Sequence, residues 1–373
     1  MLKALPAVAG YKLERVLGAP KTLPISVTLS VTNKCNSRCR TCLIWTFYQE
    51  KQSQPYMELA TEEYDRIFRS LGRQVVWATL SGGEPYLRED LPEICTGLYT
   101  HCSPNIINIA TNGLLGDVIQ KSTTRILQNC KSALIIVNLS LDGIGEEHDT
   151  IRGVPGNFRQ VMETYRLLKN LKAGFPNLRV GLHTVVSQFN IHSIPKVYEY
   201  VRGLAPDSYI TEIAENRAEL LNTNEKISPT PEDYSTIVEY LLDNMREDSR
   251  SLNDNTSKMI QALRMVYYKA AAEELLQKRE VIPCYAGYAS GQIAANGDVW
   301  PCCVLGDTRT MGNLRTYGYD FKALWLSKQA EEARRWIKDN HCHCQLANAY
   351  YTNILCNFSM VLEVLWQYLS NAL

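Results

Sequence analysis

"TNKCNSRCRTCLIW" (residues 32–45) places three cysteines, Cys35, Cys39 and Cys42, at the spacing C-x3-C-x2-C. The β-branched run "ISVTLSV" (25–31) directly before it predicts a strand. The thiols therefore belong to a loop at the carboxyl end of that strand, where chemistry gathers in parallel α/β sheets and barrels. Three thiolates can bind three irons of a 4Fe–4S cluster and leave the fourth iron open. The alternatives are a zinc site completed by a distant histidine, or three unrelated thiols.

Further along the chain, apolar and β-branched runs alternate with helical segments over the first 215 residues. This alternation requires parallel strand pairing through right-handed crossovers, and such strands are expected to be covered on both faces. The sequence therefore predicts an α/β fold with six parallel strands. The expected strands are residues 25–31, 75–81, 105–111, 133–141, 178–186 and 208–214.

The composition excludes some functional classes and sets an expected compartment. The 373 residues carry 39 Lys+Arg against 39 Asp+Glu, which gives no electrostatic case for binding nucleic acid or an anionic membrane. The first residues lack the continuous apolar run of a signal peptide, so we expect a cytoplasmic protein. In that reducing compartment, clustered members of the twelve cysteines are more typical of metal binding than of disulfides.

A second motif, "LSGGEP" (80–85), closes the second expected strand with Gly82, Gly83, Glu84 and Pro85. Paired glycines let the backbone approach a ligand closely, and a glutamate can accept hydrogen bonds from an ammonium group. The alternative is a plain glycine turn with a capping glutamate. Because the carboxyl ends of parallel strands meet at one rim, we expect this motif to lie beside the cysteine loop.

These two motifs together resemble those of the radical S-adenosylmethionine (radical SAM) superfamily, over roughly residues 24–215. The resemblance implies a partial (βα)6 barrel whose open iron chelates the amino and carboxylate groups of SAM. It also implies that one electron from the cluster cleaves SAM and releases a 5′-deoxyadenosyl radical, which removes a hydrogen atom from an unactivated carbon. An external one-electron reductant such as flavodoxin or ferredoxin would supply the electron.

Two other strand ends fit the same resemblance. "ATNG" (110–113) places Asn112 where it would meet a ribose or a main-chain group. "SLDG" (140–143) followed by "HDTIRG" (148–153) looks like the maturase-like branch of the family. By that match Ser140 and Arg152 would bind the carboxylate of SAM, since an arginine fork suits a carboxylate. Asp142 belongs either to this cofactor site or to an Asx-turn.

The last quarter of the chain carries a second group of cysteines. In "IPCYAGYASGQIAANGDVWPCC" (282–303), the Asn296-Gly297 pair predicts a hairpin between two strands. The region resembles the SPASM and shorter twitch extensions of radical SAM enzymes, and its cysteines suffice for one auxiliary 4Fe–4S cluster, which favours twitch. The resemblance implies the ligands Cys284, Cys302, Cys342 and Cys344. The late pair is spaced C-x-C where the family usually has C-x2-C, so Cys303 and Cys356 remain rivals for the fourth position, and a structural zinc is the alternative.

The segment "TEIAENR" (211–217) spans the end of the sixth expected strand. It places Glu212, Glu215 and Arg217 near the same rim. These three are our candidates for a substrate contact or a proton acceptor in catalysis. The alternative is exposed charges at a strand-to-helix junction. Residues 216–280, which follow, read as a mostly helical insert that flanks the core.

The end of the chain, "NILCNFSMVLEVLWQYLSNAL" (353–373), predicts a helix with one narrow polar stripe. Such a helix is usually buried, and we expect it to dock on the barrel and close an edge. The alternatives are a hydrophobic wall for a lipid-like substrate, a groove for a partner, or a peripheral membrane contact. A spanning helix is not expected, because Glu363 sits in the middle of the segment.

The resulting hypothesis is a radical SAM enzyme with one catalytic and one auxiliary 4Fe–4S cluster, which starts an oxidation or a bond-forming modification. A small-molecule or lipid-like substrate is favoured over a ribosomal peptide, because no separate amino-terminal peptide-recognition domain is evident. An iron–sulfur scaffold or electron-transfer protein is the non-enzymatic alternative. The expected domains are an amino-terminal extension (1–23), the barrel (24–215), the helical insert (216–280), the auxiliary-cluster domain (281–345) and the apolar helix (346–373).

Overall fold

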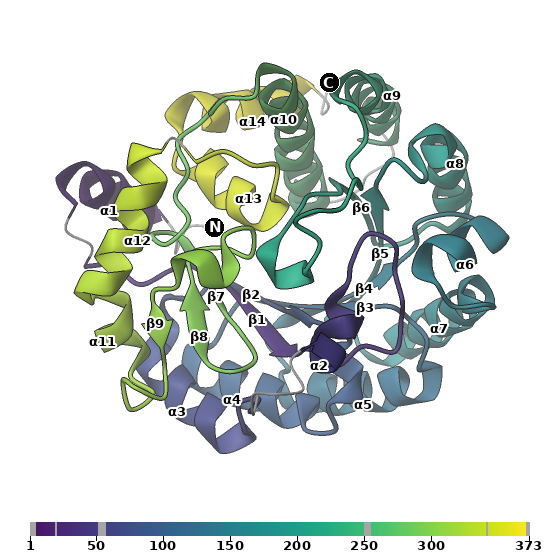
Figure 1. Ribbon diagram of the computed structural model, residues 1–373. Helices are drawn as coiled ribbons and strands as arrows, with labels where there is room; N and C mark the ends of the chain where they lie inside the picture. The colour runs from purple at the N-terminus through teal and green to yellow at the C-terminus, as the bar shows by residue number, and fades with distance from the viewer. Residues whose placement is uncertain (1–4, 19–20, 51–56, 250–254, 341, 371–373) are drawn as a thin grey trace.

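The computed structural model describes residues 5–18, 21–50, 57–249, 255–340 and 342–370. Parts of the expected domain ranges, namely 1–4, 19–20, 51–56, 250–254, 341 and 371–373, lie outside the described residues. A curved sheet occupies the centre of the molecule, and helices surround it (Figure 1). The expected α/β fold class is confirmed.

The six expected strands are present and pair in sequence order, each parallel to the next. Their buried apolar side chains lie mainly on one face: Val27, Leu29 and Val31 of β1 join the core, whereas the other face of this strand carries serine and threonine. Their bounds are β1 Ser26–Thr32, β2 Trp77–Gly82, β3 Ile106–Thr111, β4 Leu134–Ser140, β5 Leu178–Val186 and β6 Ser208–Ile213.

The helices between these strands pack on the outer face of the sheet (Figure 1). They are α3 Thr61–Leu71, α4 Leu91–Cys102, α5 Gly116–Asn129, the short α6 Glu146–Arg152, α7 Asn157–Leu171 and α8 Ile194–Leu204. Three further cysteines, Cys95, Cys102 and Cys130, are fully buried in this layer. Burial raises the pKa of Cys102 and Cys130 to about 12, so these thiols stay neutral.

The expected hairpin around Asn296-Gly297 extends the same sheet. Strand β7 Ser290–Ile293 pairs with β1 in parallel, β8 Asp298–Trp300 returns antiparallel to β7, and β9 Gly312–Asn313 follows. The sheet therefore has nine strands in the order β6-β5-β4-β3-β2-β1-β7-β8-β9. Because the edge of β1 would otherwise expose unpaired backbone groups, the hairpin serves both as part of the auxiliary region and as a cover for the barrel.

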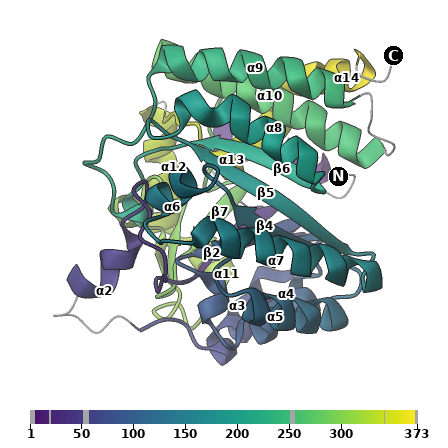
Figure 2. The same cartoon turned by 90° about the vertical axis from the view of Figure 1, so that its right-hand side faces the viewer.

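The remaining helices lie at the two sides of this sheet. The helical insert forms α9 Pro231–Ser249 and α10 Asn255–Gln277, which lie along α8 beyond β6 (Figure 2). On the side of β7 lie the amino-terminal helix α1 Leu5–Leu17 and the helices α11 Phe321–Trp325 and α12 Lys328–Asp339 (Figure 1). The short helix α2 Phe47–Glu50 follows the cysteine loop.

The carboxy-terminal segment forms two helices, α13 Ala347–Leu355 and α14 Phe358–Ser370, instead of one. The break occurs at Asn357, whose side-chain oxygen accepts a hydrogen bond from the backbone N–H of Met360, as an N-cap does. Helix α14 lies along α10, but only one of its side chains, Val364, is buried. The expectation of a buried helix is therefore met by α13 and not by α14, which exposes Phe358, Leu362, Leu365, Trp366 and Leu369. Within the described residues, no helix combines the length and the apolar character needed to cross a bilayer.

Candidate active site

Cys35, Cys39 and Cys42 lie in the loop after β1 and line one cavity of about 190 Å³ at the carboxyl end of the parallel strands. The sulfur of Cys39 is 3.3 Å from the hydroxyl of Ser37, whose backbone N–H is 3.5 Å from the sulfur of Cys35. Burial raises the pKa of Cys35 to about 11, and burial together with Cys39 raises that of Cys42. Closely spaced thiols become thiolates when a metal group supplies compensating positive charge, so this donor set fits an iron–sulfur cluster.

Glycines hold the backbone of the cysteine loop close to its neighbours. A Cβ atom on Gly83 would lie 2.1 Å from the carbonyl oxygen of Lys34, and one on Gly153 would lie 2.2 Å from that of Arg38. Gly83 also donates its backbone N–H to the carbonyl of Thr32 at 2.7 Å. Any side chain at these two positions would push the loop away, which explains why glycine occupies both.

Glu84 is fully buried and supports the loop after β3. Its carboxylate accepts hydrogen bonds from the hydroxyl of Thr111 at 2.8 Å and from the backbone N–H groups of Asn112 and Tyr86 at 2.7 and 3.2 Å. Burial, partly opposed by these donors, raises the pKa of Glu84 to about 7. Asn112 lines the cavity, and its amide donates to the side-chain oxygen of Asn36 in the cysteine loop at 2.7 Å. The carboxylate thus engages protein donors, and a direct contact of Glu84 with SAM stays a prediction.

Arg152 and Ser140 line the cavity beside the cysteines, while Asp142 lies behind them. One oxygen of Asp142 accepts a hydrogen bond from Arg152 at 3.0 Å, and the other accepts from the backbone N–H of Val185 at 2.8 Å. The Nε atom of Arg152 is buried and has no hydrogen-bond partner in the described part of the chain. Asp142 therefore orients Arg152, which keeps a free donor for an anionic group in the cavity. Because both oxygens of Asp142 accept hydrogen bonds from distant residues, these contacts favour the cofactor-site interpretation over an Asx-turn.

The opposite wall of the cavity carries all three candidates from "TEIAENR" and one histidine. Arg217 lies 3.7 Å from Glu212 and 3.6 Å from Glu215, measured between guanidinium nitrogen and carboxylate oxygen. His183 on β5 lies 3.8 Å from the other oxygen of Glu212. Sequence reasoning missed His183; a lone histidine in the apolar strand run "LRVGLHTVV" (178–186) was the available signal. The structure thus brings one cation, two carboxylates and an imidazole to face the cysteines.

Five of the late cysteines, Cys284, Cys302, Cys303, Cys342 and Cys344, belong to a second, small apolar cluster. Burial and the neighbouring Cys284 raise the pKa of Cys302 to about 12, and burial followed by Cys284 and Cys302 raises that of Cys342. Burial, followed by Glu215, Cys302 and Cys284, raises the pKa of Cys344. Cys284, Cys302, Cys342 and Cys344 are therefore electrostatic neighbours.

The two rival thiols have different surroundings. Burial raises the pKa of Cys303, Arg217 opposes this shift, and Glu219 and Cys302 add to it, whereas Cys356 packs with Tyr11 and Tyr285 beside α1. Among the described residues, no three His, Cys, Asp or Glu side chains converge on a position for one metal ion. In an iron–sulfur cluster each thiolate binds a different iron, so such convergence is not needed there.

Glu215 connects the two cysteine groups. Glu215 lines the cavity of Cys35, where its Oε2 atom faces Arg217. Its Oε1 atom accepts a hydrogen bond at 2.6 Å from the backbone N–H of Gln345, which directly follows Cys344. Burial raises the pKa of Glu215, against the opposing charge of Arg217. A single buried carboxylate thus lies between the barrel cavity and the auxiliary thiols.

Comparison with known proteins decides the family. The family model "Radical SAM superfamily" matches residues 29–201, and the model "Iron-sulfur cluster-binding domain" (SPASM) matches residues 284–345. This chain belongs to the radical SAM superfamily. The SPASM match covers the auxiliary thiols, so this radical SAM enzyme uses SAM, a 4Fe–4S cluster and an auxiliary iron–sulfur cluster. Both cysteine groups described above fit that complement.

Curated relatives of this radical SAM enzyme include porphyrin and peptide enzymes. The Fe-coproporphyrin III synthase of Methanosarcina barkeri is 32% identical over 176 residues, which is 46% of this chain but only 40% of that protein. The AdoMet-dependent heme synthase of the same organism is 26% identical and covers 81% of this chain and 82% of its own length. The subtilosin biosynthesis protein AlbA of Bacillus subtilis is 22% identical, over 90% and 71% respectively.

The fold of this radical SAM enzyme is also similar to a solved structure. Streptococcus suis SuiB, bound to its precursor peptide SuiA, superposes with a TM-score of 0.62 at 18% identity. The match covers 94% of this chain and 77% of SuiB. This similarity supports the α/β architecture with its auxiliary extension.

Proposed function

We propose that this radical SAM enzyme binds its catalytic 4Fe–4S cluster through Cys35, Cys39 and Cys42 and acts on a small molecule in the adjoining cavity. When bound, the cluster and SAM supply a carbon-centred radical that removes a hydrogen atom from the substrate. The observation that carries the proposal is the shared cavity, with three thiols on one wall and a cluster of charged side chains on the other. An external one-electron donor of the flavodoxin or ferredoxin type would provide the reducing electron.

On the wall of the cysteines, the protein would orient SAM through its amino acid moiety. Arg152 is held by Asp142 and retains an unpaired Nε, so it would bind the carboxylate of SAM together with the hydroxyl of Ser140. Gly82 and Gly83 line the cavity with backbone rather than side chains, which leaves room for the cofactor. Glu84 and Asn112 would act indirectly, because their hydrogen bonds fix the loop after β3 and the cysteine loop.

On the opposite wall, Glu212, Glu215 and Arg217 would contact the substrate, and one of the carboxylates would accept its proton. These side chains are largely shielded from solvent, with exposures of 17%, 18% and 9% for Arg217, Glu212 and Glu215, so their charges act more strongly on a bound molecule than they would at an open surface. Nε of Arg217 and one oxygen of Glu215 have no hydrogen-bond partner in the described residues, which leaves both available to a ligand.

The polar wall favours a small molecule with hydrogen-bonding groups over a hydrocarbon chain. The relatives named as heme and Fe-coproporphyrin III synthases support a small-molecule substrate. Maturation of a ribosomal peptide is the second candidate, and it is supported by the match to the subtilosin biosynthesis protein over 90% of this chain. Both candidates use the same cysteines and the same cavity.

The catalytic cluster can be tested by replacing Cys35, Cys39 and Cys42 together with alanine. Wild-type protein reconstituted without oxygen should hold about eight irons, as expected for two four-iron clusters, and the variant about four. The variant should produce no 5′-deoxyadenosine from SAM and a reductant, because its open iron is lost. Iron and sulfide analysis with a chromatographic assay measures both. Continued SAM cleavage by this variant would contradict the assignment.

The auxiliary cluster can be tested with single alanine variants of Cys284, Cys302, Cys342 and Cys344. Each should lower iron to about four per chain and abolish substrate turnover, while some cleavage of SAM persists at the barrel cluster. Cys303→Ala and Cys356→Ala serve as controls for the two rival thiols and should keep full iron, because the proposed ligation uses neither of them. If Cys344→Ala keeps its iron and a control loses it, the fourth ligand is misassigned. Four irons plus one zinc in the wild type would identify the auxiliary site as structural.

A further inference from the structure

A three-residue stretch, Met57–Leu59, lies between the end of β1 and the auxiliary hairpin; we call it the bridge. On one side, Leu59 donates its backbone N–H to the carbonyl of Ala295 in the hairpin at 2.7 Å. On the other side, one guanidinium nitrogen of Arg88 donates to the carbonyls of Leu59 and Val31, both at 2.9 Å. The bridge is therefore fixed to the auxiliary hairpin and to β1 at once.

Glu58, in the middle of the bridge, holds the residues that lead into the cysteine loop. Its Oε1 atom accepts hydrogen bonds from the hydroxyl of Thr32 at 2.7 Å and from the backbone N–H of Asn33 at 3.0 Å. The hydroxyl of Tyr48, beyond the loop, donates to the same oxygen at 2.5 Å. The Glu58 carboxylate thus binds the chain both before and after the three cysteines.

Thr32 connects Glu58 by hydrogen bonds to Lys34, the residue before Cys35. Its hydroxyl donates to Glu58 and accepts a hydrogen bond from the backbone N–H of Lys34 at 3.0 Å. The carbonyl of Lys34 in turn accepts the backbone N–H of Glu84 at 2.8 Å. Thr32 is fully buried, so a hydroxyl that lost its acceptor would leave an unsatisfied group inside the protein.

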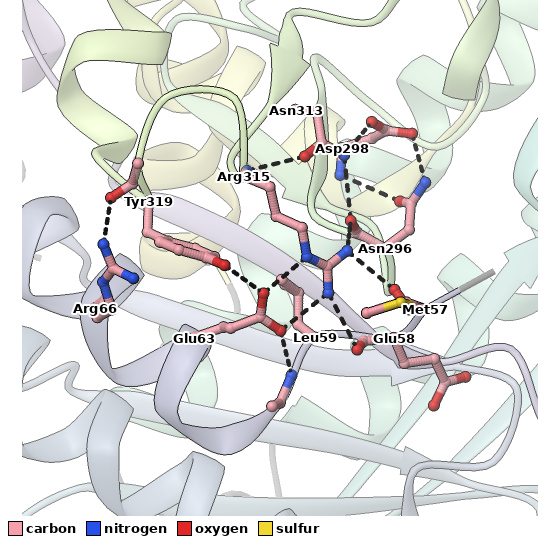
Figure 3. A network of polar contacts seen from close by, with 12 residues as sticks. Met57, Glu58, Leu59, Glu63, Arg66, Asn296, Asp298, Asn313, Arg315 and Tyr319 are labelled. Atoms are coloured by element: carbon pink, nitrogen blue, oxygen red, sulfur yellow. Dashed lines mark hydrogen bonds and ion pairs between the residues drawn. The ribbon is translucent and has the colours of Figure 1, made fainter. Parts of the chain in front are cut away.

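Arg315, from the loop after β9, fixes the bridge backbone from the auxiliary side (Figure 3). Its guanidinium donates to the carbonyls of Met57 and Glu58 at 3.1 and 3.3 Å, and to that of Asn296 at 2.8 Å. Glu63 on α3 holds the guanidinium in place through two hydrogen bonds of 2.8 and 2.9 Å. The position of the Glu58 backbone is therefore set by a residue of the auxiliary region.

We propose that Glu58 is a positioning residue for the catalytic cysteine loop, and that Arg315 couples its place to the auxiliary hairpin. Glu58 touches neither cofactor nor substrate in this proposal; it acts by holding Thr32 and Asn33. The inference rests on the proposed ligation by Cys35, Cys39 and Cys42. It explains why the auxiliary hairpin shares one sheet with the barrel, since the shared sheet keeps the bridge in register with β1.

The test uses the reconstituted full-length enzyme and a ferrous chelator, which removes iron from a cluster whose loop opens. The SAM-protected half is the iron that the chelator removes more slowly when SAM is bound. In Glu58→Ala the chelator should remove this iron at least fivefold faster, because the loss of about one hydrogen bond lowers the local stability of the cysteine loop. The other half of the iron, in the auxiliary cluster, should be released at the wild-type rate. The variant should also bind SAM about tenfold more weakly, and its reduced cluster should show an altered EPR response to SAM.

Three variants separate positioning from general stability. Glu58→Gln keeps an acceptor oxygen and should stay within about twofold of wild type, whereas Glu62→Ala, an exposed carboxylate nearby on α3, should change nothing. Thr32→Val removes the buried donor and should reproduce Glu58→Ala. Arg315→Met should accelerate iron loss from the same half, and an unchanged rate would overturn the coupling to the hairpin.

Equal acceleration of both halves in Glu58→Ala, or wild-type rates and SAM affinity, would overturn the role of Glu58. If instead the triple cysteine variant kept the SAM-protected iron, the proposed cluster assignment would be at fault. The two failures are therefore distinguishable.

Discussion

Residues of the "SLDG" and "HDTIRG" motifs form one buried hydrogen-bond network beside the cavity. His148 accepts the backbone N–H of Asp142 at 3.0 Å on one ring nitrogen and meets Asn157 at 2.8 Å with the other. Asp142 then holds Arg152, and the carbonyl of Arg152 accepts the backbone N–H of Arg38 at 3.0 Å. Burial lowers the pKa of His148, so the imidazole stays neutral and can accept that backbone proton. The motif therefore builds the site by hydrogen bonding rather than by direct chemistry.

Asp142→Asn should weaken SAM binding about tenfold, because a neutral amide no longer pairs with Arg152 and the guanidinium loses its fixed orientation. The iron content should stay at the wild-type level, since no proposed ligand changes. Equilibrium dialysis with SAM and iron analysis measure the two quantities. Glu146→Gln, an exposed carboxylate on the same α6, is the matched control. Unchanged SAM affinity in Asp142→Asn would show that Arg152 needs no partner.

At the scale of elements, the carboxylate of Glu63 attaches the loop after β9 to α3. Glu63, near the start of α3, accepts two hydrogen bonds from Arg315 and one from the hydroxyl of Tyr319 at 2.6 Å (Figure 3). Burial alone would raise the pKa of Glu63, but the hydrogen bonds from Arg315 and Tyr319 outweigh it and lower the pKa to about 2. The contact joins segments about 250 residues apart in sequence.

Glu63→Gln should lower the free energy of unfolding by about 2 kcal/mol at pH 7, because the charge-assisted hydrogen bonds are lost. The folded pKa lies below the ordinary value of 4.5, so the carboxylate stabilises the fold above pH 4.5 and loses that effect only as pH falls toward 2. The difference between variant and wild type should thus be constant from pH 8 to pH 5.5. Denaturant titrations at several pH values measure it, and a difference that shrinks within this range would refute the assignment.

At the scale of the whole molecule, the continuous sheet makes the barrel and the auxiliary region one unit. Strand β7 packs against Trp325, which is fully buried and whose indole N–H donates to the carbonyl of Thr22 at 3.2 Å. A Cβ atom on Gly291 would lie 2.7 Å from the Trp325 ring. The join between the two regions is therefore tightly packed and depends on a glycine.

Gly291→Ala should cost about 1–3 kcal/mol of stability, because the ring of Trp325 must move to admit the methyl group. Hydrogen exchange should increase in β7 and in β1 together, since the two strands share their backbone hydrogen bonds. Gly203→Ala on α8, where a Cβ meets nothing within 4 Å, is the control and should leave both strands unchanged. Faster exchange in β7 alone would mean that the auxiliary region unfolds separately from the barrel.

The sequence by itself indicated the six parallel strands, the fold class and the residues of the cysteine motif. The apolar runs, the Asn296-Gly297 turn and the cysteine spacing are local signals, because each depends only on neighbours in the chain. The sequence also indicated that the strand ends share one rim, since parallel strands must present their carboxyl ends together. Glu212, Glu215 and Arg217 were therefore found without coordinates, although their pairing distances were not.

The tertiary structure alone decided which distant side chains share a hydrogen bond. The roles of Glu58 and Arg315, the backing of Arg152 by Asp142 and the place of His183 depend on contacts between remote segments. The same is true of α14, whose apolar pattern predicted burial although its partner α10 covers only one face. Burial and electrostatic pairing are set by the packing of elements that no local pattern specifies, which is the physical reason that these features required the fold.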